Sequence, residues 1–168
     1  MQDHSQPVHH DWKLRLTELL PLYGHRNWIV VADSAYPVQS NPGIETIVAG
    51  GDHLSVIKHV FLSIAQTRHV RANVFADREL EFVSVSDAPG VLDYSRKLGA
   101  VLPGVSISFL PHEQIIQKLD ESAKLFRVLI VKTDMTVPYT SVFFQLDCGY
   151  WSADAEQRLR KAMLEKSK

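Results

Sequence analysis

The stretch WIVVADSAYP, residues 28–37, decides the fold class because it joins a buried strand to a polar stop. Its first five residues are apolar and rich in β-branched side chains, with no polar alternation, which is typical of a strand covered on both faces. Asp33 opens a polar segment, and Pro37 blocks further strand pairing. Before this stretch, the apolar residues between Trp12 and Tyr23 recur at helical spacing. A helix pattern is therefore followed by a strand pattern.

The same alternation continues to the end of the chain. Strands are expected over 28–32, 44–49, 105–109, 126–131 and 140–146, and over 70–85, which fits one long strand or two shorter ones. Helices are expected over 12–23, 52–64, 89–98, 112–123 and 153–165. Strands separated by helices predict an α/β fold, a three-layer sandwich with a mostly parallel sheet.

The composition is that of one ordinary globular domain, with 168 residues of which 45% are apolar and 22% charged. We expect a polar N-terminal arm over 1–10 and a single α/β domain over 11–151. An extra C-terminal helix over 152–168 is expected to pack on that domain or at a subunit interface.

Charge and cysteine content exclude several classes of function. Lys and Arg number 18 against 19 Asp and Glu, and a net charge of -1 argues against binding to a nucleic-acid backbone. The single Cys148 excludes an internal disulfide and a thiolate zinc site within one chain. The polar leader has no apolar h-region and no apolar run is long enough to cross a bilayer, so we expect a cytoplasmic protein without membrane partners.

Polar residues at the ends of predicted strands form the candidate site. There is no P-loop, nucleophile elbow, His-Glu-x-x-His motif or dinucleotide-binding glycine turn, so we expect no nucleotide cofactor. Ligands of open α/β sheets bind outside the carboxyl ends of the strands, where Asp33 and His112 are expected. His25 enters the first strand and lies up to ~26 Å from Asp33 in one subunit. The two share a site only if His25 comes from a neighbouring subunit or the chain folds back.

Each of these residues also has a structural interpretation. His25 follows a predicted helix end, where a cation is favoured, and Asp33 is suited to capping a loop. His112 is suited to a hydrogen bond at a helix start, and Tyr139 to packing. A zinc site formed by His25, Asp33 and His112 is a further alternative.

Three segments, in order, resemble the RbsD/FucU sugar-mutarotase family. Gly24-His25, the apolar strand and 33–37 are similar to that family's Gly-His, strand and Asp-Ala-x-x-Pro signature, with the same eight residues from His to Asp. The run 112–114, His-Glu-Gln, resembles ribose-type members, since fucose-type members tend to carry Arg there. The run 138–141, Pro-Tyr-Thr-Ser, is similar to the family's Tyr-x-Asn, and the resemblance covers about 14–151.

The resemblance implies an RbsD-like fold assembled into a homo-oligomeric ring, a pentamer or decamer, with the active site at a subunit interface. It implies an isomerase of carbohydrate metabolism, a mutarotase or pyranase acting on a free pentose or deoxyhexose without metal or cofactor. His25 is implied as the general acid/base, because one imidazole near neutrality can serve both proton transfers of a hemiacetal opening. The implied substrate-binding residues are Asp33, His112, Tyr139, Thr140 and Ser141.

The sequence departs from the family pattern near the implied site. Ser141 stands where the family usually has Asn, and 132–135 lacks the family's Gly and Glu. The helix after His112 is longer by about one turn. These departures leave the sugar open and favour a second hypothesis, a non-catalytic sugar-binding or regulatory relative. A third hypothesis is another enzyme, such as an aldose isomerase or lyase, built on the same interface.

Overall fold

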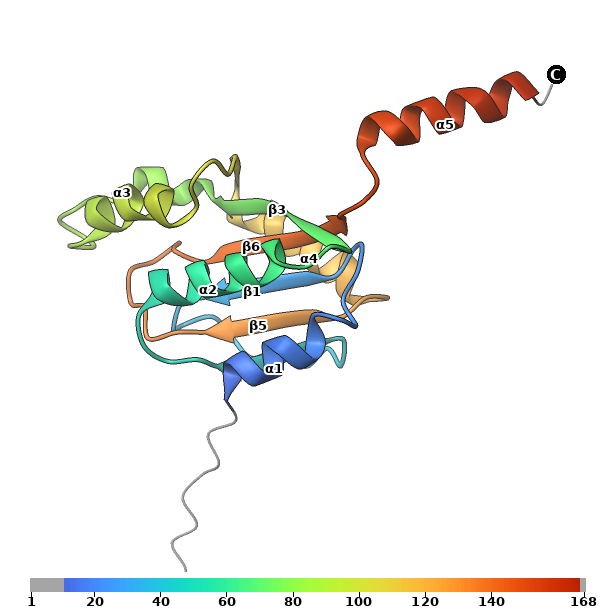
Figure 1. The fold of residues 1–168 in the computed structure, drawn as a ribbon. Coiled ribbons are helices and arrows are strands. Elements are labelled where there is room, and N and C mark those ends of the chain that lie inside the picture. The colour runs from blue at the N-terminus through green and yellow to red at the C-terminus, as the bar shows by residue number, and fades with distance from the viewer. Residues whose placement is uncertain (1–10, 167–168) are drawn as a thin grey trace, which may run out of the picture.

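In the computed structural model, which describes residues 11–166, a six-stranded sheet forms the centre of the molecule (Figure 1). Its strands are β1 (Trp28–Ala32), β2 (Ile44–Val48), β3 (Val70–Asp77), β4 (Ile107–Leu110), β5 (Val128–Lys132) and β6 (Val142–Cys148). The helices are α1 (Trp12–Leu19), α2 (His53–Ala65), α3 (Val91–Val101), α4 (His112–Ala123) and α5 (Ala153–Lys166), with a 3-10 helix η1 (Arg78–Phe82) after β3. The expected arm over 1–10 lies outside the described residues.

The strand order is β2-β5-β1-β6-β3-β4. The β2–β5, β5–β1 and β3–β4 pairs are parallel, whereas β6 runs antiparallel to both of its neighbours, β1 and β3. On the central strand, Val30 pairs with Ile130 on one side and Phe143 on the other. The predicted α/β fold with a mostly parallel sheet is therefore confirmed.

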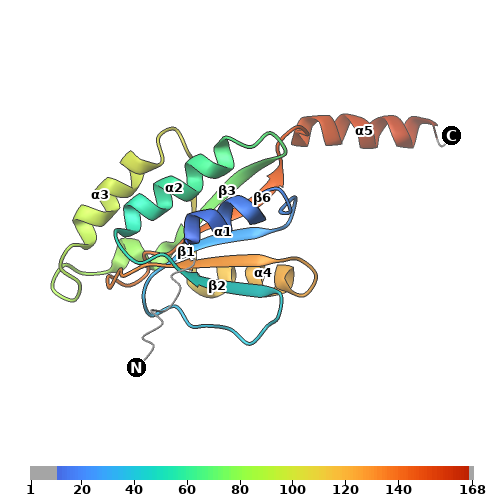
Figure 2. The same cartoon turned by 60° about the horizontal axis from the view of Figure 1, so that its bottom comes forward.

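Helices cover both faces of the sheet and make three layers. Figure 2 shows α1, α2 and α3 on one face and α4 on the other. On β1, Ile29 and Val31 pack in the core beneath the first three helices, whereas Val30 and Ala32 pack in the core beneath α4. The whole of β1 is buried, which explains its continuous apolar sequence.

Local sequence features account for two helix boundaries. Asp52 caps α2, since its carboxylate accepts a hydrogen bond from the Ser55 backbone N–H at 2.8 Å. The apolar spacing before β1 continues to Tyr23, yet α1 ends at Leu19. Pro21 explains the difference, because proline has no N–H to continue the helical ladder. Tyr23 nevertheless remains in the core.

The sheet has two functionally different ends. The carboxyl ends of β1, β3, β4 and β5 lie together, and the start of β6 joins them because that strand runs the opposite way. The opposite end of the sheet holds the residues before β1 and the last residues of β6. We call these the carboxyl end and the His25 end of the sheet.

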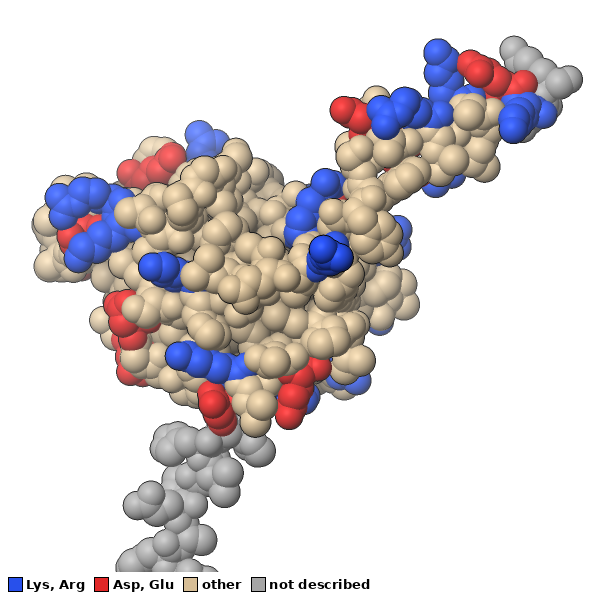
Figure 3. All heavy atoms as spheres, viewed as in Figure 1, with Lys and Arg blue, Asp and Glu red and all other residues tan. Residues whose placement is uncertain are grey.

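The C-terminal helix α5 stands away from the rest of the fold (Figures 1 and 3). None of its residues is buried, and Figure 3 shows charged side chains of both signs along it. Its start is tied to the segment before it, since the Trp151 indole N–H donates to Glu156 at 2.7 Å. Of the two expected placements, α5 does not pack on the domain, and a place at a subunit interface stays a prediction.

Within residues 11–166, no helix has the length and apolar character needed to span a membrane.

Candidate functional site

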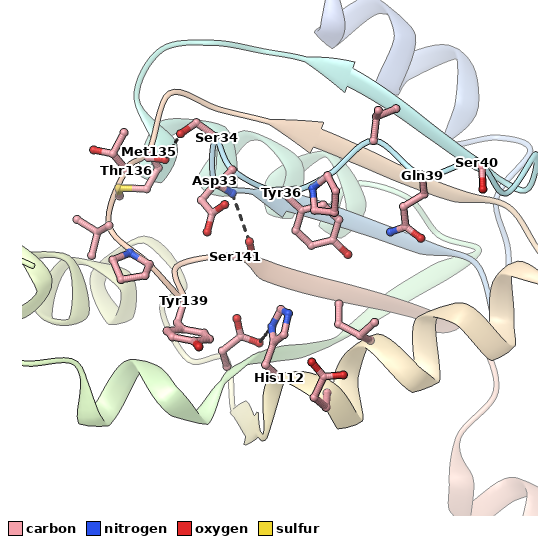
Figure 4. A pocket seen from close by; sticks show the side chains of 18 residues that line it. Asp33, Ser34, Tyr36, Gln39, Ser40, His112, Met135, Thr136, Tyr139 and Ser141 are labelled. Carbon is pink, nitrogen blue, oxygen red and sulfur yellow. Dashed lines mark hydrogen bonds and ion pairs between the residues drawn. The ribbon is translucent and has the colours of Figure 1, made fainter.

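A cavity of about 900 Å³ opens at the carboxyl end of the sheet (Figure 4). Four parts of the chain line it: the loop 33–40 after β1, the end of β3, the start of α4, and the loop 135–141 before β6. These are the segments that the strand-end rule for open α/β sheets brings together. The volume lies within the range of small-molecule binding sites.

Asp33 and Ser141 hold the two long loops of the cavity together. The Asp33 backbone N–H donates to the Ser141 hydroxyl at 3.3 Å. The Ser34 backbone N–H and hydroxyl both donate to the Met135 carbonyl, at 2.9 and 2.8 Å. Because the backbone of Asp33 makes the loop contact, its carboxylate is left to face the cavity, as Figure 4 shows.

His112 begins α4 and is anchored by two acidic residues. Its Nδ1 lies 3.0 Å from an Asp77 carboxylate oxygen, and its backbone N–H donates to both Glu79 carboxylate oxygens at 3.0 Å. Asp77 is 1% exposed, and burial raises the pKa of its carboxyl group to about 6 against the lowering effect of His112. Figure 4 shows the His112 ring turned into the cavity.

Tyr139 adopts a backbone conformation that is rare outside glycine, with φ at +58°. Its ring meets the His112 ring edge to face, with centroids 5.9 Å apart. Strained residues of this kind persist where their surroundings determine the backbone, often at ligand sites. The structure therefore brings Asp33, His112, Tyr139 and Ser141 to one cavity.

Thr140, expected among the substrate-binding residues, lies behind the cavity wall. It is fully buried, and its hydroxyl donates to the Val137 carbonyl at 2.8 Å. Its carbonyl is 2.7 Å from both the His53 Nε2 and the Tyr94 hydroxyl. Both groups donate to this carbonyl, which fixes the peptide between Thr140 and Ser141.

His53 is buried and hydrogen-bonds to both Thr133 and Thr140. Because a carbonyl only accepts, the His53 Nε2 carries the proton, and its Nδ1 accepts from the Thr133 hydroxyl at 2.6 Å. Burial lowers the pKa of His53, which keeps the ring neutral in this arrangement. His53 and Tyr94 thus position Tyr139 and Ser141 without reaching the ligand space themselves.

His25 lies at the His25 end of the sheet and does not line the cavity. Its side chain is 60% exposed, and its Nε2 is 3.6 Å from an Asp147 oxygen. Within one subunit His25 and Asp33 lie beyond opposite ends of β1, so one chain does not bring them together. Within one chain, the described residues contain no group of three His, Cys, Asp or Glu side chains placed to hold a metal ion.

Comparison with known proteins supports the α/β fold described above. No family model matches the chain. A curated D-ribose pyranase of Lactobacillus acidophilus is 26% identical over 129 residues, which cover 73% of this chain and 82% of that protein. The structure of Bacillus subtilis RbsD complexed with D-ribose matches with a TM-score of 0.57 and 19% identity, over 88% of this chain and 98% of that one. The chain is thus similar in sequence to a D-ribose pyranase and in fold to RbsD.

A second solved structure has a similar fold. The fucose mutarotase from Streptococcus pneumoniae in complex with L-fucose matches with a TM-score of 0.53 and 19% identity. It covers 84% of this chain and 97% of its own length. At this identity the two solved structures show the shared fold, and the resemblance indicated by the sequence is confirmed at that level.

One departure from the family pattern has a visible consequence. Asp134 is the acidic residue in 132–135 that stands nearest to the family's Glu, but its carboxylate accepts from the Gly51 N–H at 2.8 Å. Asp134 is not part of the cavity lining. The carboxylates that do line the cavity are Asp33, Asp77 and Glu113.

Sequence reasoning missed Asp77, Glu79, His53 and Tyr94. A signal for Asp77 was present, since it is an acidic residue at the end of a strand, as Asp33 is. However, apolar residues also occur after Asp77, in η1, so the sequence does not show that the strand ends at Asp77. His53 and Tyr94 stand on helices 87 and 46 residues away from Thr140, and no local pattern indicates those contacts.

Proposed function

We propose that this chain is a mutarotase-like isomerase that interconverts the anomers, or the pyranose and furanose forms, of a free pentose or deoxyhexose. The observation that carries this proposal is the meeting of Asp33, His112 and Tyr139 at one cavity at the carboxyl end of the sheet. A carboxylate, an imidazole and a phenol offer both donors and acceptors to sugar hydroxyls. The relatives named D-ribose pyranase and fucose mutarotase support the same class of reaction.

The proposed reaction needs proton transfer and no other chemistry. The hemiacetal opens when a proton leaves the anomeric hydroxyl and another reaches the ring oxygen, and the ring closes by the reverse steps. An imidazole that titrates near neutrality can give or take either proton. We assign the delivery of the ring-oxygen proton to His25 and the binding of sugar hydroxyls to Asp33, Tyr139 and Ser141. No cofactor takes part in this scheme.

The proposal requires a homo-oligomer, because His25 and the cavity lie at opposite ends of the sheet. We infer that the His25 end of one subunit meets the carboxyl end of the next, a head-to-tail arrangement that closes into a ring. The exposed His25 side chain and the unpacked α5 both lie beyond the His25 end. The α5 helix is therefore proposed to contact the neighbouring subunit.

The first experiment is NMR exchange spectroscopy over a panel of free aldoses with wild type and His25→Ala. We expect faster exchange for one sugar and a loss of about 10²–10⁴ in the catalysed rate in the variant. His59→Ala is the matched control, since it removes an imidazole that packs edge to face on Trp12 outside the cavity. Full activity of His25→Ala in a correctly assembled oligomer would overturn the assignment of His25.

A mixing experiment tests whether the site is shared between subunits. His25→Ala and Asp33→Asn chains are co-expressed and purified as mixed oligomers. If each site takes His25 from one chain and Asp33 from another, random mixing restores about a quarter of the sites. If both residues served a site within one chain, the mixture would show no more activity than its inactive components.

The second candidate function is a sugar-binding or regulatory relative without catalysis. It is favoured by Ser141, which cannot offer both an amide donor and a carbonyl acceptor, and by the Asp134 carboxylate outside the cavity. In this case calorimetry detects sugar binding to the wild-type protein while its exchange spectra match those of the sugar alone.

A further inference from the structure

The most constrained titratable pair in the cavity is Asp77 and His112. Asp77 ends β3, and its carboxylate is buried at 3.0 Å from the His112 Nδ1. Only 1% of Asp77 is exposed, and the His112 imidazole lies within hydrogen-bond distance of its carboxylate. A buried carboxylate needs such a partner, because an unpaired charge in an apolar setting is strongly unfavourable.

The geometry determines which His112 nitrogen is available to a ligand. An ionised carboxylate only accepts hydrogen bonds, so the Nδ1 carries the proton that is shared with Asp77. In the neutral ring the Nε2 then holds a free electron pair. Because the ring lines the cavity, that electron pair is the basic site within reach of a ligand (Figure 4).

Two further contacts fix the position of the ring. The Glu79 carboxylate accepts the His112 backbone N–H through both oxygens, which anchors the first turn of α4. The Tyr139 ring packs edge to face against the imidazole. A side chain that only binds a sugar hydroxyl does not need a buried carboxylate behind it, whereas a general base gains from one that holds its tautomer and stabilises its cation.

We propose that His112 is a catalytic base of the cavity and that Asp77 is the positioning residue that holds it in the basic tautomer. This inference rests on the proposed function. The His112 Nε2 takes the proton of the anomeric hydroxyl as the C=O bond forms. The bond between the anomeric carbon and the ring oxygen breaks, and the ring oxygen takes a proton from His25 of the neighbouring subunit. Reclosure reverses each transfer.

Several acidic groups surround the Asp77–His112 pair. Asp33 and Glu79 face Asp77 and both disfavour its ionised form, while His112 favours it. Glu113 lines the same cavity. The imidazolium that forms at His112 during the reaction therefore stands among carboxylates, and its contact with Asp77 becomes a charge-assisted hydrogen bond.

His112→Gln separates catalysis from binding, since the amide keeps hydrogen-bonding capacity but cannot take up a proton at neutral pH. The assay is NMR exchange with the sugar that wild type accelerates. We expect kcat to fall by about 10²–10⁴ with a small change in KM. A raised KM with an unchanged kcat would show that His112 only binds, and would overturn the inference while leaving the mutarotase proposal intact.

Asp77→Asn tests the positioning role, with Asp93→Asn as the matched control that removes a half-exposed carboxylate outside the cavity. We expect kcat of Asp77→Asn to fall by roughly 10–10³, and the acidic limb of its pH profile to move down by roughly one unit, because the imidazolium loses its anionic partner. In the control variant, both the fall in kcat and the shift of the acidic limb should be smaller. An unchanged pH profile in Asp77→Asn would leave Asp77 with a structural role alone.

Imidazole 15N spectra test the pair without any assay of activity. Wild type should show His112 protonated at Nδ1, and Asp77→Asn should populate the Nε2–H form, because an amide can donate to the Nδ1. A wild-type Nε2–H tautomer would overturn the inference directly. If wild type shows the Nδ1–H form and yet accelerates no sugar, the mutarotase proposal has failed and His112 has no reaction to catalyse.

Discussion

The two ends of the central sheet differ in how much of their function one chain can build. At the carboxyl end, His112 is fixed by Asp77 and Glu79, and the peptide after Thr140 is fixed by two buried donors. At the opposite end, His25 is largely exposed, and its contact with Asp147 is 3.6 Å long. A proton donor needs a defined position to act, so the carboxyl end is preorganised within the subunit and the His25 end depends on a neighbour.

This difference separates stability from activity. Buried groups that satisfy one another contribute to the folded state of the single chain, and removing one leaves its partner unpaired. An exposed side chain with one long contact contributes little, whatever its value in an assembled site. Substitutions at the carboxyl end should therefore lower the free energy of unfolding, whereas substitution of His25 should lower activity alone.

His53→Ala should have the largest effect on stability. It removes a buried ring and leaves the Thr140 carbonyl with one donor, so we expect the free energy of unfolding to fall by about 2–4 kcal/mol in urea titrations. Tyr94→Phe removes the other donor alone and should cost about 0.5–1.5 kcal/mol. His25→Ala should change it by less than about 0.5 kcal/mol. Similar losses in His53→Ala and His25→Ala would break the comparison between the two ends.

The sequence is sufficient to predict the layers of this fold. The uninterrupted apolar run of β1 indicates a strand buried on both faces, and Asp52 marks the start of α2 by its capping chemistry. The strand-end rule also predicted that Asp33 and His112 would lie near each other, and both line the cavity. These features depend on period and on local chemistry, which a single sequence displays.

The support of the site could not be predicted in this way. The contact between His53 and Thr140 joins residues 87 positions apart, and it depends on how α2 lies over the sheet. Asp77 stands at a strand end that the apolar residues of η1 conceal, because a 3-10 helix buries Leu80 much as a strand would. Long-range contacts of this kind follow from the packing of elements, which no local period encodes.

The pH dependence of stability sharpens the comparison at Asp77. Its pKa is raised from 3.8 to about 6, so folding favours the neutral carboxyl group. The corresponding stability is fully present below pH 4 and is lost as the pH rises through about 6. Asp77→Asn stays neutral, so its free energy of unfolding relative to wild type should increase by about 1–3 kcal/mol between pH 4 and 7. Urea titrations of both proteins across this range measure the difference.

Asp147 at the His25 end provides the opposite case. Its pKa is lowered, with Arg71 and His25 among the causes, while partial burial opposes the shift. The stability that comes from a lowered pKa is present at neutral pH and is lost as the pH falls. Asp147→Asn should therefore have a lower free energy of unfolding than wild type at neutral pH, and the difference should disappear in acid. If Asp77→Asn instead tracked wild type at every pH, the carboxyl group of Asp77 would be as well solvated as a surface residue.

The smallest effect on the fold is expected from removing residues 152–168. Since α5 has no buried residue, the free energy of unfolding of the remaining domain should change by no more than about 0.5 kcal/mol when measured at high dilution. Its proposed contact with a neighbouring subunit predicts a second result, a smaller oligomer in analytical ultracentrifugation at micromolar concentration. High dilution separates the two effects, because subunit contacts stabilise the fold only while the chains are associated. An unchanged oligomer would place the interface on the sheet end itself, at His25, and would leave α5 outside the assembly contact.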